Sequence, residues 1–163
     1  MYAKSKIMAE KAAWDFREAL PEAERFEIVT ILPSFVLGPN LRADWFASGD
    51  WLRRLMTGEM TEIGSDGCAI VDVRDVALAH FNAIKLDAAA NKRFIVSHSS
   101  QPWAECARPV IAKYQPLGWP ICTTHAAVDP EKKTTMFNNA ASREVLGIEY
   151  RDFPTTMIEM ADA

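Results

Sequence analysis

The sequence has few glycines, no basic stripe and no long apolar run. Its seven glycines form no Gly-x-Gly-x-x-Gly or Gly-x-x-Gly-x-x-Gly pattern after a strand, which excludes a recognisable phosphate-binding loop. A net charge of -4 without clustered cations argues against nucleic acid as a partner. No apolar segment approaches the roughly 20 residues of a membrane span. The amino terminus does not have a signal-peptide pattern either, so we expect a cytoplasmic protein that does not bind a membrane.

Cysteine and histidine are also scarce. The three cysteines are scattered and form no Cys-x-x-Cys pair, which is typical of reduced cysteines that serve in packing (Cys68, Cys106 and Cys122). The histidines have no metal-ligand spacing, so we expect no metal site (His80, His98 and His125).

The first turn of a predicted helix carries the most informative pair of residues. Residues 3–20 are rich in Ala, Lys and Glu, which favours a helix that ends at Pro21. Tyr2 and Lys6 are four residues apart, so their Cβ atoms lie about 5–6 Å apart on one helical face. An ammonium near a phenol lowers the pKa of the tyrosine, which can then exchange a proton with a carbonyl or alcohol oxygen. Taken alone, such a pair is more often part of an ordinary surface helix.

A buried strand and a proline-rich segment follow. Residues 27–32 are short, β-branched and almost continuously apolar, as expected for a strand buried on both faces of a parallel sheet. Residues 33–39 contain two prolines and a glycine, and they predict a loop at the carboxyl end of that strand. Ligands bind at such ends in open α/β sheets.

The rest of the chain alternates between helices and short strands. Two acidic residues, Asp72 and Asp75, suit the start of a helix as caps, and a catalytic carboxylate is the less favoured alternative. His80 is predicted to be packed and hydrogen-bonded within that helix. The aromatic residues Trp45, Phe46 and Trp51 fit a pocket or the core. The predicted helices are 48–57, 74–86, 102–114, 139–146 and 153–160, and the predicted strands lie within 61–73, at 92–97 and near 121–123.

The order of these motifs resembles one known family. A Tyr-x-x-x-Lys helix is followed by Pro-Ser-Phe-Val-Leu-Gly-Pro at 33–39 and by Val-Asp-Val-Arg-Asp-Val-Ala-Leu-Ala-His at 71–80. This order resembles the extended short-chain dehydrogenase/reductases, in the branch of dihydroflavonol reductase, cinnamoyl-CoA reductase and yeast-type aldehyde reductases. Residues 139–148 also resemble the near-terminal helix of that branch, whereas residues 115–135 match least well.

The resemblance implies a reaction and assigns roles to five residues. The reaction is hydride transfer between NADP(H), with NAD as the alternative, and a small-molecule aldehyde, ketone or secondary alcohol. Tyr2 would be the general acid or base, and Lys6 would hold the nicotinamide ribose and lower the pKa of Tyr2. Pro33 and Val36 would lie against the nicotinamide, and Ser48 would lie near the cofactor phosphates.

The resemblance also implies an α/β fold, but only its C-terminal part. Residues 1–39 and 71–97 would form a Rossmann-like part with parallel strands and flanking helices, and residues 40–70 and 98–163 would mainly form a small substrate lobe. The family's glycine-rich βαβ unit and its active-site serine or threonine precede the tyrosine. Neither is found here, and Leu32 replaces an asparagine common in this branch. We therefore expect a truncated reductase that is inactive by itself.

Two functions remain open at this point. The chain is part of an NAD(P)H-dependent carbonyl reductase, or it is a non-catalytic remnant or interaction module that kept the C-terminal lobe. In either case strand 27–32 would lack neighbouring strands, and an unpaired edge invites pairing with another chain. We therefore expect a missing amino-terminal segment or an oligomer to pair with strand 27–32, or else poor solubility.

Overall fold

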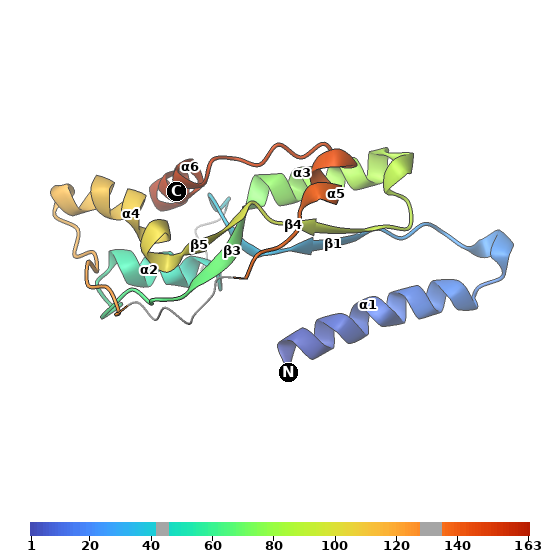
Figure 1. Cartoon of the computed structure of the whole chain (residues 1–163), viewed down its shortest axis with the longest axis horizontal. Helices are drawn as coiled ribbons and strands as arrows, with labels where there is room; N and C mark the ends of the chain where they lie inside the picture. Colours follow the sequence, from blue (N-terminus) through green and yellow to red (C-terminus); the bar gives the residue numbers. More distant parts are fainter. Residues whose placement is uncertain (42–45, 128–134) are drawn as a thin grey trace.

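The computed structural model describes residues 1–41, 46–127 and 135–163, in which helices alternate with short strands (Figure 1). The helices are α1 (Tyr2–Ala19), α2 (Gly49–Met56), α3 (Val73–Lys85), α4 (Trp103–Tyr114), α5 (Ala140–Glu144) and α6 (Phe153–Asp162), with short 3-10 turns at Glu22–Glu24, Asp87–Ala89 and Gln115–Leu117. The strands are β1 (Thr30–Pro33), β2 (Phe35–Leu37), β3 (Gly67–Asp72), β4 (Arg93–Val96) and β5 (Ser99–Pro102).

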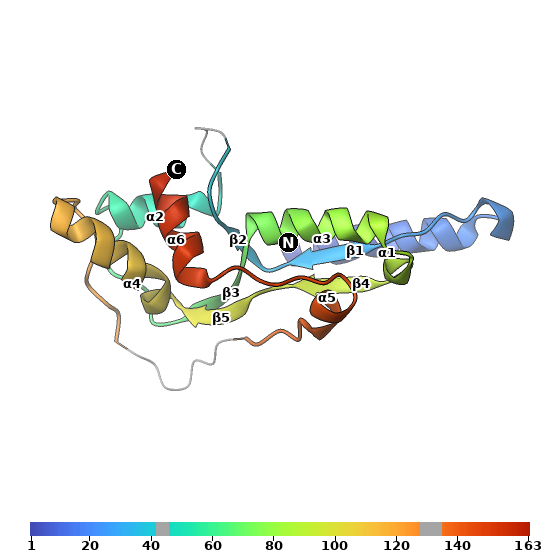
Figure 2. The same cartoon turned by 90° about the horizontal axis from the view of Figure 1, so that it is seen from above.

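The strands form two small sheets. The chain passes from the first sheet to the second twice, from β1 into β2 and from β4 into β5. β1 pairs in parallel with β4, and β2 pairs in parallel with β3, which in turn pairs antiparallel with β5. Helix α3 covers one face of β1 and β4, and α1 runs along the opposite face (Figures 1 and 2). The predicted α/β fold, with parallel strands and flanking helices, is therefore confirmed.

The boundaries of β1 and the loop after it differ from the prediction. The strand is Thr30–Pro33 rather than 27–32, because its partner β4 begins at Arg93, directly opposite Thr30. The predicted loop at 33–39 contains the strand β2, which exists because β3 lies beside it and supplies backbone partners. Within the described part of the chain, β1 pairs along one edge with β4, and no strand lies along its other edge.

Two apolar clusters hold the elements together. One cluster joins β2 and β3 to α2, α4 and α6, and includes Leu55, Val110 and Met157 with no exposed surface. The other joins α3, β1 and β4, and includes Phe94. Leu146, which follows α5, is fully buried in this second cluster, so the segment after α5 packs beside the parallel strands. The division of the chain into two parts stays a prediction.

Helix α1 is held loosely compared with the other long helices. None of its residues is buried, and Ile7, Met8 and Phe16 are exposed. Its main link to the sheet is an ion pair in which Arg93 Nε lies 2.5 Å from Glu10 Oε1. The pKa of Glu10 is lowered by hydrogen bonds, most strongly from Arg93 and also from Trp14 and Thr30. Polar contacts rather than apolar packing therefore position α1.

Three smaller predictions need correction or cannot be placed. No strand forms at 121–123 in the described structure, because the backbone N–H of Cys122 donates to the carbonyl of Leu55 on α2. His80 is hydrogen-bonded to the carbonyl of Val76, as predicted, but its side chain is exposed rather than packed. Trp45 lies outside the described residues. None of the described helices has the length and apolar character needed to cross a membrane.

Candidate active site

Tyr2 and Lys6 face each other on the first turns of α1. The Lys6 ammonium lies 5.5 Å from the centroid of the Tyr2 ring, which agrees with the four-residue spacing. The Tyr2 side chain is 76% exposed. The helix thus presents a phenol and an ammonium together on a solvent-accessible surface, where both can reach a bound molecule.

A hollow of about 210 Å³ opens at the carboxyl ends of β1 and β4. Side chains alternate along a strand, and Ile31 packs in the cluster with α3. Leu32 and Ser34 therefore point to the opposite face, where α1 lies (Figures 1 and 2). The hollow is lined by Leu32, Pro33, Ser34, Ile95 and Phe137. The residues of its lining are apolar except for Ser34.

Ser34 is a residue of this hollow that the sequence analysis did not select. Its backbone N–H donates to the carbonyl of Val96 over 3.1 Å. Its hydroxyl oxygen is buried and has no hydrogen-bond partner among the described residues. A buried polar group without a partner is uncommon in folded proteins, because desolvation is then uncompensated. In the sequence, only its position directly after Pro33 in the predicted loop marks Ser34.

A network of hydrogen bonds fixes the chain just after β4. The backbone N–H of Ser97 donates to the Tyr150 hydroxyl oxygen at 3.2 Å, and the side chains of Ser142 and Tyr150 are 2.7 Å apart. Asn139 Nδ2 donates to the carbonyl of Ser97 at 2.7 Å. These contacts tie residues 139–150 to the end of β4, close in sequence to Phe137, which forms one wall of the hollow.

The five residues selected from the sequence occupy different places. Tyr2 and Lys6 contact each other, and Pro33 lines the hollow. Val36 lies on β2 and packs against the cluster that contains α3. Ser48 precedes α2 and makes no side-chain capping bond there. Neither Val36 nor Ser48 belongs to the lining of the hollow, and their contacts with a cofactor stay predictions.

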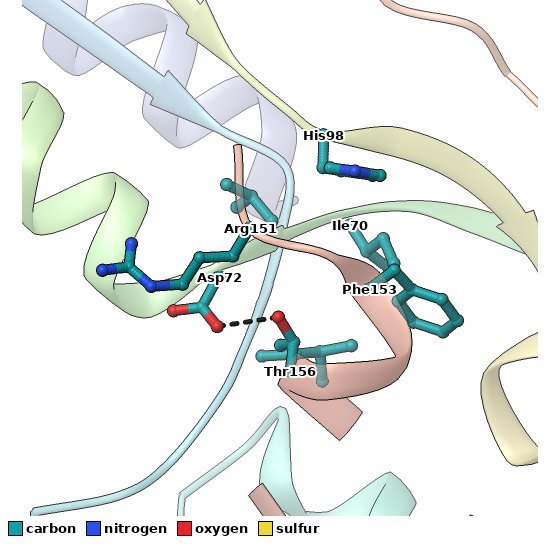
Figure 3. Close-up of a pocket in the computed structure, with 8 residues that line it drawn as sticks. Ile70, Asp72, His98, Arg151, Phe153 and Thr156 are labelled. Carbon is teal, nitrogen blue, oxygen red and sulfur yellow. Dashed lines mark hydrogen bonds between the residues drawn. The ribbon is translucent and has the colours of Figure 1, made fainter. Parts of the chain in front are cut away.

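A second, much smaller hollow lies where α6 meets the start of α3 (Figure 3). Its volume is about 10 Å³, room for about one water molecule and too little for a substrate. Asp72 caps α3 by accepting from the backbone N–H of Arg74 at 2.8 Å, as predicted. The Thr156 hydroxyl on α6 donates to the same carboxylate at 2.7 Å. The predicted capping role of Asp72 is confirmed, and its carboxylate joins two helices.

The thiols of Cys68 and Cys106 are poor candidates for nucleophiles. Burial raises the pKa of the Cys68 thiol to about 12, with a smaller contribution from Asp66. Cys106 has no exposed surface, and burial likewise raises the pKa of its thiol. Since the thiolate is the reactive form, both thiols stay unreactive near neutral pH. These two thiols are therefore not candidates for the reacting group of the site.

Comparison with known proteins relates the whole chain to reductases. No protein-family model matches the chain. The chain is 35% identical to "Ketoreductase azaE" of Aspergillus niger over 165 residues, which is 94% of this chain and 47% of that protein. It is 28% identical to the NADPH-dependent methylglyoxal reductase GRE2 of Saccharomyces cerevisiae, covering 98% of this chain and 49% of that protein. The chain thus spans about half the length of the curated relatives it matches.

Solved structures show the same relation. The structure of Gre2 from Candida albicans in complex with NADPH matches 94% of this chain, with 27% identity and a TM-score of 0.73, and 48% of the solved chain is covered. A second structure of Gre2 from Candida albicans gives a TM-score of 0.79 at 26% identity over 99% of this chain and 50% of the solved one. Matches to half of each relative agree with the prediction of a partial reductase fold. By sequence and by fold, the chain is homologous to the reductases of the extended short-chain dehydrogenase/reductase family.

Proposed function

We propose that this chain supplies the proton-transfer half of an NADPH-dependent reductase that acts on an aldehyde or ketone. The observation that carries the proposal is the Lys6 ammonium 5.5 Å from the Tyr2 ring on helix α1. Relatives named as NADPH-dependent methylglyoxal reductase and as ketoreductase support both the reaction and the choice of NADPH over NAD.

The chain's own residues fit the nicotinamide end of such a cofactor. Leu32, Pro33 and Ile95 give apolar walls against which a flat ring can lie. NADPH, when bound, supplies the hydride. The Tyr2 hydroxyl donates its proton to the carbonyl oxygen, and the Lys6 ammonium stabilises the phenolate left on Tyr2. In the opposite direction Tyr2 accepts the proton from an alcohol.

The pyrophosphate end of the cofactor has no matching loop in the sequence, so the proposal requires a second structural unit. The free edge of β1 can accept a parallel strand from a glycine-rich α/β unit. Leu78, Phe81 and Ile84 are exposed on α3, on the outer side of the same sheet, and offer apolar surface to that unit. The 163-residue chain by itself is accordingly expected to be inactive.

The test is a fusion that places the amino-terminal half of the yeast methylglyoxal reductase before Met1. Turnover of a panel of aldehydes and ketones is followed through NADPH absorbance. Tyr2→Phe keeps the ring but removes the proton, so we expect kcat to fall by roughly 100-fold to 10,000-fold. Lys6→Met should also lower kcat, whereas Lys4→Met, an exposed lysine on the same helix, should leave it unchanged.

Two results would contradict the proposal. If Tyr2→Phe retains most of the turnover, Tyr2 is not the proton donor. If the wild-type fusion binds NADPH but reduces no carbonyl compound in the panel, the non-catalytic alternative is favoured. NADPH binding is therefore measured separately, by the change in nicotinamide fluorescence.

A further inference from the structure

One carboxylate joins the middle of α1 to the sheet. Glu10 follows Lys6 by four residues and Tyr2 by eight, so the three side chains lie on successive turns of one helical face. We propose that Glu10 is a positioning residue that sets how far along the sheet α1 lies, and that it thereby holds Tyr2 and Lys6 level with the carboxyl ends of β1 and β4. This inference rests on the proposed function, and Glu10 acts only through Tyr2 and Lys6.

Glu10 contacts the first residue of each of the two parallel strands. Its carboxylate accepts two hydrogen bonds from Arg93, from Nε to Oε1 at 2.5 Å and from Nη2 to Oε2 at 3.1 Å. Thr30 also hydrogen-bonds to this carboxylate. Thr30 and Arg93 are directly opposite each other in the register of β1 and β4. The carboxylate is therefore fixed at one level of the sheet, the amino ends of the two strands.

This contact determines the level of Tyr2 along the sheet, because α1 runs antiparallel to β1 (Figures 1 and 2). The eight helical residues from Glu10 back to Tyr2 span about 12 Å at the rise of an α-helix. The strand from Thr30 to Pro33 spans about 10 Å at the rise of a parallel strand. With Glu10 at the level of Thr30, Tyr2 therefore lies nearly level with Pro33. This is the end of the strand at which ligands bind in open α/β sheets.

The other contacts of α1 do not fix this level. The helix has no buried residue, so none of its side chains is locked in an apolar cluster. In the described structure its remaining side-chain hydrogen bonds stay within the helix or join it to residues 20–26, which directly follow it. Arg17 Nε, for example, donates to the Phe26 carbonyl at 2.7 Å. Loss of the Glu10 contact therefore leaves α1 free to slide or tilt, while the paired strands and both apolar clusters remain.

The first test measures the position of α1 in the 163-residue chain without any ligand. A nitroxide attached after Lys4→Cys, at an exposed position of α1, broadens the NMR signals of nearby backbone amides. The amide of Val96 should broaden more than that of Arg93, because the amino end of α1 lies toward the carboxyl end of β4. Glu10→Ala should abolish most of this difference. Asp15→Ala, which removes an exposed carboxylate of the same helix, should leave it unchanged.

Arg93→Ala removes the contact from its other side. The Arg93 side chain is 59% exposed, so its loss leaves the apolar clusters intact. The difference in broadening should decrease as it does for Glu10→Ala. The double variant should show no further loss, because both substitutions remove the same interaction.

The second test follows turnover in the fusion with the amino-terminal half of the yeast reductase. Both single variants should lower kcat by at least roughly tenfold, since small displacements of a catalytic group are costly. They should also raise the solvent deuterium isotope effect on kcat, because proton transfer from Tyr2 becomes the slow step. A smaller folded fraction would lower kcat without changing this isotope effect, so the two measurements distinguish positioning from stability.

Two results overturn the assignment. If both variants keep the wild-type pattern of broadening, the contact does not set the position of α1. If kcat is unchanged, or falls without a change in the isotope effect, Glu10 does not position Tyr2. The NMR measurement needs neither cofactor nor turnover, and the proposed reaction is judged separately by Tyr2→Phe. Failure of the Glu10 assignment is therefore distinguishable from failure of the proposed function.

Discussion

At the scale of single residues, Asp72 is a buried charge that joins two helices. Its side chain is 2% exposed and receives hydrogen bonds from the backbone and side chain of Arg74 and from Thr156. Arg74 also pairs with Glu159 on α6. Burial by itself would raise the pKa of Asp72, but the hydrogen bonds from Arg74 and Thr156 outweigh it, and the pKa lies below its usual value.

This pKa shift predicts how the stability of the chain depends on pH. Because the folded-state pKa of Asp72 is lowered, its stabilisation is complete above the unfolded-state pKa of about 4 and is lost as the pH falls through the folded-state value. Asp72→Asn should lower the free energy of unfolding by about 2 kcal/mol at pH 7, because buried donors lose a charged acceptor. Urea titrations should give a smaller difference from wild type at pH 3.

The control for this prediction is Asp15→Asn. Asp15 pairs with Lys11 on the surface of α1, where both side chains are more than half exposed. Such a pair contributes little to stability, so the same titration should give no measurable change. An equal loss for Asp72→Asn at pH 7 and pH 3 would show that the effect does not come from the carboxylate charge.

At the scale of secondary-structure elements, two glycines end helices with a left-handed backbone conformation but have different surroundings. Gly58 follows α2 with φ +74°, and a Cβ there would lie 2.6 Å from the Pro120 carbonyl oxygen. Gly147 follows α5 with φ +64°, and no atom lies within 4 Å of a Cβ at that position. Both serve as helix ends, but only Gly58 also allows a close backbone approach.

Alanine substitutions at Gly58 and Gly147 distinguish the cost of a left-handed backbone from the cost of a steric clash. Gly147→Ala should cost about 1 kcal/mol, the cost of placing a side chain in the left-handed region. Gly58→Ala should cost at least twice as much, since α2 must also move away from Pro120. Thermal unfolding of the two variants measures both costs. Equal losses would mean that the segment around Pro120 yields freely to the added methyl group.

The elements also show why sequence reasoning succeeded in some places and failed in others. Helices α2 and α3 were predicted because local signals mark their ends, namely Gly58 after α2 and Asp72 before α3. Strand β5 has the sequence Ser-Ser-Gln-Pro, which has no β-forming character, and it exists because β3 pairs with it. In the candidate site, the spacing of Tyr2 and Lys6 was visible in sequence. The unpaired Ser34 hydroxyl and the wall formed by Phe137 depend on tertiary packing, which no local pattern specifies.

At the scale of the whole molecule, the chain has strong packing on one side and little on the other. The two apolar clusters hold β1–β4, α2–α4 and α6, whereas α1 has no buried residue. Helix α1 runs along one face of the sheet that contains β1 (Figures 1 and 2). In the same sheet, one edge of β1 pairs with no described strand. Helix α1, which carries Tyr2 and Lys6, is therefore less well supported than the paired strands and the other long helices. A companion α/β unit would stabilise the site itself and not only the fold.

This arrangement predicts which parts of the chain change when the companion unit is present. In the 163-residue chain, backbone amides of α1 should exchange with solvent much faster than those of α3, because local opening of α1 breaks few buried contacts. In the fusion with the amino-terminal half of the yeast reductase, exchange in α1 and β1 should slow by at least roughly tenfold, since a strand then lies along the free edge of β1. Helix α4, which packs in the other cluster, is the internal control and should change little. If α1 is as protected as α3 in the chain alone, the pair of Tyr2 and Lys6 is already held in place, and the companion unit is needed for cofactor binding rather than for building the site.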